Sequence, residues 1–306
     1  MTPKIFLNSK FSLANLFLLC YNFFMIKIEF PIEYFNINDT LTCGQFFRYK
    51  PFDKGFLVFS LDKCAYCYQT DDKTIIECEN ADKGYFYNFF DLFRDYSLIC
   101  NSAKSFGVEI LTTACKLGKG IRILNQDKIE TLFTFIISQN NNIPRIKKSI
   151  EKICTHLGEK KTFLSQEYFA FPKIEKLASA PLDFYKSAGL GYRAEYFSHL
   201  ANSILNGYDL TDFENLTTAD LKKELVKIRG VGPKVADCVS LFGYHRADSF
   251  PVDTWIEKVY REDFNGKEKD RNKITEYLLQ RFGENAGYFQ QYLFHYKRLN
   301  SKPNKK

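Results

Sequence analysis

The chain lacks the features that mark several well-defined classes of protein. It has no internal repeat and no low-complexity block, so nothing indicates a repeat architecture. Its nine cysteines are odd in number and follow no repeated spacing, which argues against a disulfide framework and indicates a reducing compartment. The apolar stretch from Phe11 to Met25 is too short for a comfortable membrane span, and no small-residue cleavage site follows it. We therefore expect a protein that is neither secreted nor bound to a membrane.

Charge and apolar content leave the class of protein open. A formal net charge of +7 is compatible with nucleic-acid binding but does not decide it, because many enzymes are mildly basic. With 45% hydrophobic residues, the 306-residue chain can bury one large core or two smaller ones. Cys64, Cys67 and Cys78 lack a convincing fourth ligand, and their period-2 apolar setting favours buried thiols in strands over a metal site. No metal is expected.

The two ends of the sequence differ from the rest. Residues 1–25 form an apolar N-terminal extension, and we hypothesise that Met25 is the native start or that this segment is only loosely attached. The intact mass of the native protein distinguishes these two possibilities. Residues 301–306 are expected to form a frayed basic tail.

The pattern of apolar residues changes once along the chain. Between residues 26 and 115 it begins with short β-prone runs, Gly55–Phe59, Ala65–Gln69 and Thr74–Cys78, separated by turn residues at 62–63 and 71–73. From Gly84 onward the periodicity is helical, and the main expected helices span 129–138, 144–157, 194–205, 218–228, 233–242, 254–260, 273–282 and 286–299. This order predicts an α+β protein, with an antiparallel sheet domain (26–115) followed by an all-helical core (116–300).

A helix-hairpin-helix is the most informative motif. The helix predicted from Thr218 is interrupted at Gly230-Val231-Gly232, and Pro233 restarts a helix at the position where a missing N–H costs nothing. Such a turn leaves backbone N–H groups at a helix N-terminus facing outward, which suits a DNA phosphate.

Lys234 follows the hairpin at an unusual position. A lysine in the first turn of a helix opposes the macrodipole, and burial would add to this effect, so we expect a lowered pKa and a neutral amine available as a nucleophile. Asp253 would supply a nearby carboxylate that moves protons or stabilises a developing cation. The structural alternatives are a solvated surface lysine and a helix N-cap at Asp253, and Asp253 can be a cap and a catalyst at once. The two residues together favour the functional interpretation.

This pairing resembles the helix-hairpin-helix (HhH-GPD) DNA glycosylases, the superfamily that includes endonuclease III and the 8-oxoguanine DNA glycosylases. A lysine in the second helix of the hairpin implies the bifunctional branch, which forms a Schiff base at the sugar C1′ and can then cut the strand. No cysteine follows Cys238, so the four-cysteine iron–sulfur cluster of the endonuclease III branch is not expected, and no other cofactor is. The resemblance implies an N-terminal sheet domain before a helical glycosylase core.

Two segments resemble the family's contacts to the unpaired base. Asn140 and Arg145 lie in a stretch similar to the 8-oxoguanine glycosylase pattern, which implies contacts with the cytosine left behind when the lesion is extruded. Tyr192 and Arg193 are expected to fill the gap in the stack and to hold that cytosine, respectively. The structural alternatives are a capping loop at Asn140 and a buried tyrosine beside a surface arginine.

The lesion pocket is expected from two further resemblances. Gln290 and Phe294 share one helix face and are similar to the family's base-contacting glutamine and phenylalanine, although an aromatic stripe at this spacing is usually core. The segment around Gly44 resembles the stretch whose glycine carbonyl reads the lesion, the alternative being an ordinary turn glycine. Cys238, one turn after Lys234, is expected to line the same pocket or to be a plain packed thiol.

These resemblances predict a base excision repair enzyme. It would remove 8-oxoguanine, preferably opposite cytosine, from double-stranded DNA through a Lys234 Schiff base and then cleave the strand as a β-lyase. We expect a monomer, in the cytoplasm or nucleoid of a prokaryote or the nucleus of a eukaryote. The rival interpretations are a non-catalytic helix-hairpin-helix DNA-binding module and a glycosylase for another damaged purine. One departure is Trp255, which occupies the position of a phosphate-contacting histidine in eukaryotic members, so this contact is not transferred.

Overall fold

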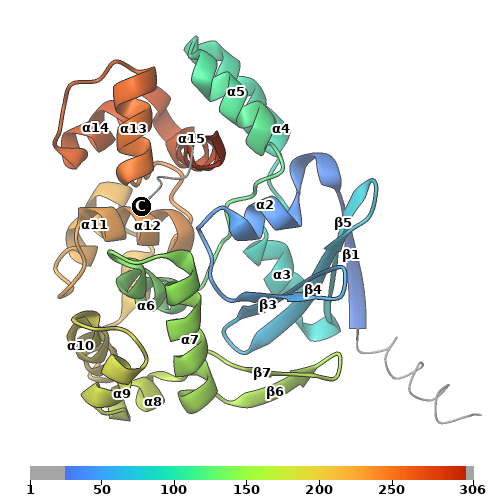
Figure 1. The fold of residues 1–306 in the computed structure, drawn as a ribbon, viewed down its shortest axis with the longest axis vertical. Helices are drawn as coiled ribbons and strands as arrows, with labels where there is room; N and C mark the ends of the chain where they lie inside the picture. Colours follow the sequence, from blue (N-terminus) through green and yellow to red (C-terminus); the bar gives the residue numbers. More distant parts are fainter. Residues whose placement is uncertain (1–24, 301–306) are drawn as a thin grey trace, which may run out of the picture.

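The computed structural model describes residues 25–300, in which a sheet domain stands beside a larger helical body (Figure 1). The sheet has five antiparallel strands in the order β1-β5-β4-β3-β2. Its strands are β1 (Met25–Pro31), β2 (Tyr49–Phe52), β3 (Gly55–Ser60), β4 (Lys63–Gln69) and β5 (Lys73–Glu79). The predicted α+β class and the sheet-then-helix order are confirmed.

The three predicted strands correspond to β3, β4 and β5, whereas β1 and β2 were not predicted. Met25, which the sequence analysis assigned to the extension, begins β1 and pairs with Glu79 of β5. The predictions for residues 1–24 and for the tail at 301–306 lie outside the described residues. The turn between β3 and β4 falls at Leu61-Asp62, one residue earlier than expected, and Leu61 has a positive φ of 52°.

The cysteines of the sheet are buried on opposite faces. Cys64 packs with Leu57 and Phe163, while Cys67 and Cys78 belong to the cluster on the other face, where α2 (Ile37–Thr42) and α3 (Lys83–Phe89) cover the sheet. All three are buried free thiols in strands, as expected, but the predicted period-2 burial is not found, because five consecutive residues of β4 are buried. Within residues 25–300, no group of three or more His, Cys, Asp or Glu side chains is placed to hold a metal ion.

The helical body contains most of the remaining chain, and its helices bring distant segments together (Figure 1). They are α4 (Tyr96–Ser102), α5 (Glu109–Gly118), α6 (Lys128–Ser138), α7 (Ile143–Leu157), α8 (Ile174–Ser179), α9 (Leu182–Ser187), α10 (Arg193–Leu205), α11 (Thr218–Leu225), α12 (Pro233–Gly243), α13 (Thr254–Asp263), α14 (Arg271–Phe282) and α15 (Ala286–Asn300). The helices predicted beyond residue 128 all form, with ends shifted by a few residues. Although α5 begins before residue 116, where the helical core was expected to start, it packs against α15 within the helical body.

The expectation of an all-helical core was wrong in one place. A hairpin of β6 (Lys160–Phe163) and β7 (Gln166–Phe169) follows α7. Its turn residues, Leu164 and Ser165, both have positive φ, 48° and 59°, as a two-residue type I′ turn requires. Because this turn has neither the Asn nor the Gly that usually marks it, the sequence shows no hairpin signal. Phe163 packs on the sheet beside Leu57, so the hairpin covers part of one sheet face.

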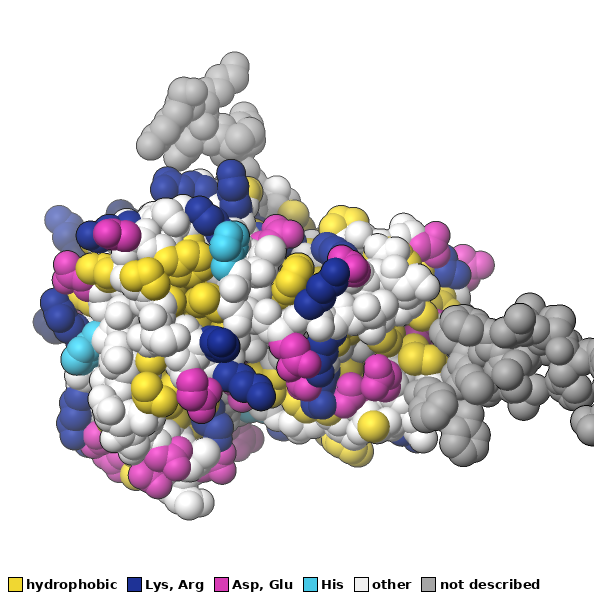
Figure 2. Space-filling model, turned by 90° about the horizontal axis from the view of Figure 1, so that it is seen from below, with side chains coloured by type: hydrophobic (Ala, Val, Ile, Leu, Met, Phe, Trp, Pro, Cys, Tyr) yellow, Lys and Arg dark blue, Asp and Glu magenta, His cyan; other side chains and the backbone are white. Residues whose placement is uncertain are grey.

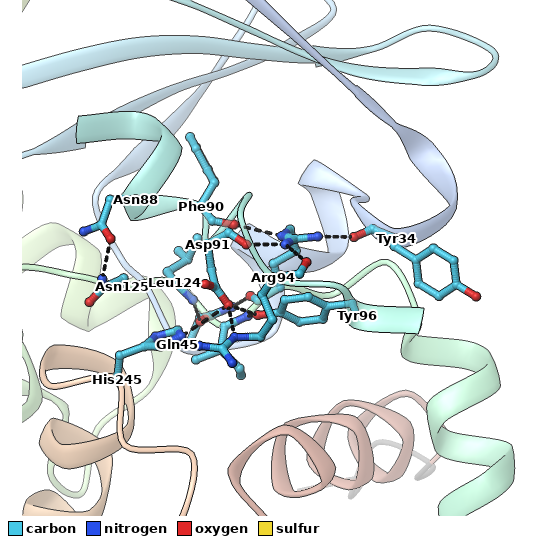
Figure 3. Close-up of polar contacts among 12 residues, drawn as sticks. Tyr34, Gln45, Asn88, Phe90, Asp91, Arg94, Tyr96, Leu124, Asn125 and His245 are labelled. Atoms are coloured by element: carbon cyan, nitrogen blue, oxygen red, sulfur yellow. Dashed lines mark hydrogen bonds and ion pairs between the residues drawn. The ribbon is translucent and has the colours of Figure 1, made fainter. Parts of the chain in front are cut away.

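A buried arginine joins the two parts of the molecule, and the residues that surround it, Tyr34, Phe90, Asp91 and Arg94, are labelled in Figure 3. Arg122 is fully buried, and its guanidinium donates to the carbonyl oxygens of Phe90 (2.9 Å), Tyr34 (3.0 Å), Arg94 (3.0 Å) and Asp91. The Asp91 carboxylate in turn lies 3.2 Å from Nε2 of His245, which belongs to the loop after α12. The loop after α3, the segment before α6 and the loop after α12 are therefore fixed relative to one another.

The surface does not present a single field of one sign. On the face seen in Figure 2, Lys and Arg side chains are interspersed with Asp and Glu, so the positive net charge is not gathered there. Among the described helices, none is both long enough and apolar enough to cross a membrane.

Candidate active site and DNA-binding surface

The hairpin forms between α11 and α12 with the geometry expected from its glycines. Gly230 has a φ of +90°, and a Cβ at this position would lie 2.4 Å from the Tyr196 ring, so no other residue fits without displacing that ring. Gly232 is the N-cap of α12, and a Cβ there would meet nothing within 4 Å. The N-terminus of α12 is therefore open for close approach of an anion such as a phosphate.

Lys234 and Asp253 line one small cavity, of about 60 Å³. Lys234 lies in the first turn of α12, and Asp253 is the N-cap of α13, so two helix N-termini converge there. Cys238, one turn after Lys234, lines the same cavity and is hydrogen-bonded to the lysine. Burial raises the pKa of Cys238 to about 11, so it is a neutral thiol at neutral pH.

The expected lowering of the Lys234 pKa was wrong. Burial does act to lower this pKa, but Cys238 and Asp253 oppose it, and the pKa is raised above its ordinary value. Because Cys238 is uncharged at neutral pH, the carboxylates of Asp253 and Asp237 are the neighbours that then favour the ammonium form of Lys234. The helix position alone did not reveal these two neighbours. Lys234 must therefore lose a proton before it can act as a nucleophile.

Asp253 caps a helix and also places a carboxylate near Lys234. Its Oδ1 accepts hydrogen bonds from the backbone N–H groups of Trp255 and Ile256, both at 3.0 Å, which caps α13. The cap does not use Oδ2. Burial raises the pKa of Asp253, while the two cap bonds and Lys234 act to lower it. The expected cap is thus present, and it does not occupy the whole carboxylate.

The predicted lesion-pocket residues lie together in this cavity. Gln290 and Phe294 belong to α15, and Gly44, with a φ of +91°, lies just after α2 and beside Phe294. Gln290 Nε2 donates to the carbonyl of Pro251 at 3.1 Å, which fixes the orientation of the amide because a carbonyl can only accept. Gln290 Oε1 is buried without a partner among the described residues. Gln290, which lines the cavity, thus retains an unused acceptor.

The residues expected to contact the unpaired base form a second group that adjoins the hairpin. Asn140 is exposed with a φ of +45°, and Tyr192 is 54% exposed. Arg193 is buried instead, and its guanidinium donates to the carbonyls of Gln139 (2.7 Å), Leu190 (3.1 Å) and Asn140 (3.0 Å). In the free protein Arg193 therefore holds the Asn140 loop rather than presenting a free guanidinium.

Gln139 links this group to the hairpin, because its Nε2 donates to the carbonyl of Gly230 at 2.9 Å. The Arg145 side chain is exposed at the start of α7, whose N-cap is Asn142. The Tyr192 ring stands edge-on to Tyr196, the residue that contacts Gly230. The exposed ring, the Asn140 loop and the hairpin thus form one connected surface.

Comparison with known proteins assigns this arrangement to a family. Residues 27–132 match the 8-oxoguanine DNA glycosylase N-terminal domain, and residues 133–285 match the HhH-GPD superfamily of base excision DNA repair proteins. The 8-oxoguanine glycosylase/lyase of Clostridium acetobutylicum, solved with double-stranded DNA containing cytosine opposite 8-oxoguanine, is 33% identical with a TM-score of 0.84, over 90% of this chain and 99% of that one. The chain belongs to the 8-oxoguanine DNA glycosylase family.

Other relatives support the same family assignment. The structure of MBOgg1 with a low-affinity DNA ligand is 35% identical with a TM-score of 0.85, covering 90% of this chain and 96% of that one. The probable N-glycosylase/DNA lyase of Methanothermobacter thermautotrophicus is 31% identical over 59% of this chain and 64% of its own length. The matches to the curated relatives thus span between 42% and 64% of the length of those proteins.

Several residues that line this cavity were not predicted from the sequence. Phe135 of α6, Phe242 of α12 and Gln291 of α15 also line it, as does Pro251. The two phenylalanines belong to apolar stripes that resemble ordinary core. Gln291 carried a usable signal, because a glutamine on the apolar side of a helix requires a partner when buried.

Asp237 is a further buried carboxylate of the glycosylase domain, and it makes stability depend on pH. Its pKa is raised to about 6, chiefly by burial, although Lys222 Nζ lies 2.5 Å away. Because the folded pKa exceeds the unfolded value, ionising Asp237 costs stability as pH rises from about 4 to above 6. We expect the free energy of unfolding of wild type, relative to Asp237→Asn, to fall by about 3 kcal/mol over this range. Urea unfolding of both proteins at a series of pH values measures this difference, and a constant difference would contradict it.

Proposed function

We propose that the protein is a bifunctional DNA glycosylase/lyase that removes 8-oxoguanine from double-stranded DNA as a monomer. The observation that carries the proposal is the convergence of Lys234, Asp253 and the unpaired Gln290 Oε1 in one cavity behind an open helix N-terminus. A nucleophile, a carboxylate and a base-reading acceptor are the groups that such a reaction needs. The DNA-bound Clostridium relative supports the same substrate.

The proposed reaction begins when an extruded nucleotide enters the cavity. Neutral Lys234 attacks the sugar C1′, forming a C–N bond while the bond from C1′ to the base breaks and the base leaves with that electron pair and a proton. The Asp253 carboxylate stabilises the positive charge that develops on the sugar. The C1′–O4′ bond then breaks as O4′ takes up a proton, which opens the sugar ring and leaves an iminium, the Schiff base, between Lys234 and C1′. The iminium acidifies the proton on C2′, and removal of that proton forms the C2′–C3′ double bond while the C3′–O bond breaks, so that the phosphate leaves with the electron pair and the strand is cut.

Selection of the lesion is proposed to depend on Gly44 and Gln290. 8-Oxoguanine has a donor at N7 where guanine has an acceptor, so a carbonyl at Gly44 gains a hydrogen bond with the lesion and meets lone-pair repulsion with guanine. Such a difference is worth roughly 1–3 kcal/mol, the cost of an unmade buried hydrogen bond. The free acceptor of Gln290 complements the N–H donors on the Watson–Crick edge of a guanine. Undamaged guanine is in vast excess, so the earlier extrusion and insertion steps must also discriminate.

Arg145 is proposed to select cytosine on the opposite strand. Its exposed guanidinium can donate to cytosine O2 and N3, whereas Arg193 is already engaged with carbonyls in the free protein. We expect single-turnover excision to be faster opposite cytosine than opposite adenine, and Arg145→Ala to reduce this preference about tenfold. Excision measured opposite all four bases tests this expectation, and equal wild-type rates would contradict it.

The raised pKa of Lys234 predicts how lyase activity depends on pH. If only the neutral amine forms the Schiff base, cleavage of a preformed abasic site should rise with pH through the range from about 6 to 9, which lies below the raised pKa. The slope of log rate against pH should be close to one. A flat profile would indicate instead that the proton passes to Asp253 within the site before attack.

Borohydride trapping tests the proposed function directly. A duplex with one 8-oxoguanine opposite cytosine, beside the undamaged duplex, should give a covalent protein–DNA band only with the lesion. Salt-sensitive binding to both duplexes without a band would indicate a DNA-binding module. Trapping on an abasic site without 8-oxoguanine excision would indicate a glycosylase for another lesion.

A further inference from the structure

Helix α15 presents two different rows of side chains to the segment that contains Gly44. Gln290 and Phe294 line the cavity, and Phe294 Cε1 would lie 3.4 Å from a Cβ at Gly44. Gln291 and Arg298, seven residues apart and therefore on one side of the helix, donate to backbone carbonyls just before Gly44. The second row takes no part in the proposed chemistry.

Gln291 has the burial and contacts of a group with a defined structural task. Its side chain is only 2% exposed, and Nε2 donates to the carbonyl oxygen of Cys43 at 2.9 Å. The two residues are separated by almost the whole chain, so the bond joins the last helix to the end of α2. Gln291 also lines the cavity, together with Gly44 and Lys234. A buried amide without this partner would cost roughly 1–3 kcal/mol.

The bond acts on the geometry of Gly44 because of the peptide that it holds. The Cys43 carbonyl and the Gly44 N–H belong to the same planar peptide, so the bond to the carbonyl fixes the orientation of this peptide plane. The Gly44 φ of +91° is the rotation of the next part of the backbone relative to that plane. The next residue is also held, since Gln45 Nε2 donates to the Arg122 carbonyl at 2.7 Å and Gln45 Oε1 accepts from the Leu124 N–H at 2.9 Å. Gly44 is flexible by nature but is restrained on both sides.

We propose that Gln291 is a positioning residue that orients the Gly44 carbonyl and so determines recognition of the lesion base. The inference rests on the proposed function, because it concerns the same pocket. Arg298, which donates to the Thr42 carbonyl, keeps the segment attached to α15 when Gln291 is changed. Loss of the Gln291 bond should therefore let the peptide between residues 43 and 44 rotate, while the segment stays attached to α15.

The test compares two activities of Gln291→Met, which keeps the side-chain length but removes the donor. Excision of 8-oxoguanine opposite cytosine requires the base pocket, whereas cleavage of a duplex with a preformed abasic site requires only Lys234 and the sugar. We expect single-turnover excision to fall between about fivefold and a hundredfold, with abasic-site cleavage unchanged within about twofold. Gln280→Met, the same change at an exposed position of α14, is the matched control and should alter neither rate.

The possible outcomes separate the inference from the function on which it rests. A parallel fall of both rates with a lower unfolding midpoint would show a role in stability and overturn the proposal, as would wild-type excision by Gln291→Met. If the wild-type protein cleaves abasic sites but excises no 8-oxoguanine, the proposed substrate is wrong and the inference falls with it. A crystal structure of the variant should show that the Gly44 φ has moved away from its wild-type value.

Discussion

Replacing Lys234 by Gln is expected to abolish borohydride trapping and cleavage of abasic sites. The amide of glutamine has nearly the reach of the lysine, but its nitrogen lone pair is delocalised and does not attack C1′. The loss should reach roughly 10⁴-fold or more, because removal of a nucleophile usually leaves only the catalysis that binding and electrostatics provide. Binding to the lesion duplex should persist, since the hairpin glycines and the N-terminus of α12 do not depend on the Lys234 charge.

The measurement is covalent trapping on an abasic-site duplex together with a binding titration at fixed salt. Lys273→Gln is a suitable control, because Lys273 is exposed on α14 and pairs only loosely with Glu268, at 3.8 Å. It makes the same change in net charge and should leave trapping intact. Undiminished trapping by the Lys234 variant would show that another amine forms the Schiff base.

Replacing Asp253 by Asn is expected to slow excision by roughly 10²–10³-fold without weakening binding to the lesion. Asparagine accepts the two N–H groups at the start of α13 almost as well as aspartate, so the cap survives. The negative charge that would stabilise the sugar cation is lost. The same change removes one of the causes that raise the pKa of Lys234, so the slower rate could not be explained by a less available amine.

A third variant separates capping from catalysis at this position. Asp253→Ala loses both the charge and the cap, so it should also lose about 1 kcal/mol of stability. Single-turnover excision and urea unfolding of the two variants provide the comparison. Near-wild-type excision by Asp253→Asn would reduce Asp253 to a structural residue, and equal stability of the two variants would contradict the importance of the cap.

The parts that could be predicted from the sequence are those specified by local chemistry. Gly230, Gly232 and Pro233 define a hairpin through backbone conformation alone, and the lysine that follows breaks a local rule in a visible way. The family resemblance then supplied the order of domains and the composition of the pocket.

Features that depend on distant neighbours could not be predicted. The pKa of Lys234 is set by Asp253 and Cys238 at their folded distances, and the bond between Gln291 and Cys43 spans most of the chain. The turn of the β6–β7 hairpin is occupied by Leu164 and Ser165, residues that usually avoid positive φ, so the tertiary packing of Phe163 overrides the local preference.

The buried guanidinium of Arg122 has a consequence for how the protein unfolds. It is shared by carbonyl oxygens from two separate segments, at Tyr34 and at Phe90–Arg94, so separating the sheet domain from the helical body would leave a cation and its acceptors unpaired at the same time. A small separation of the two parts already breaks the Arg122 hydrogen bonds, so most of the electrostatic cost arises at the start of unfolding. The two parts should therefore melt in one cooperative transition, and a helical fragment expressed without the sheet should be poorly soluble.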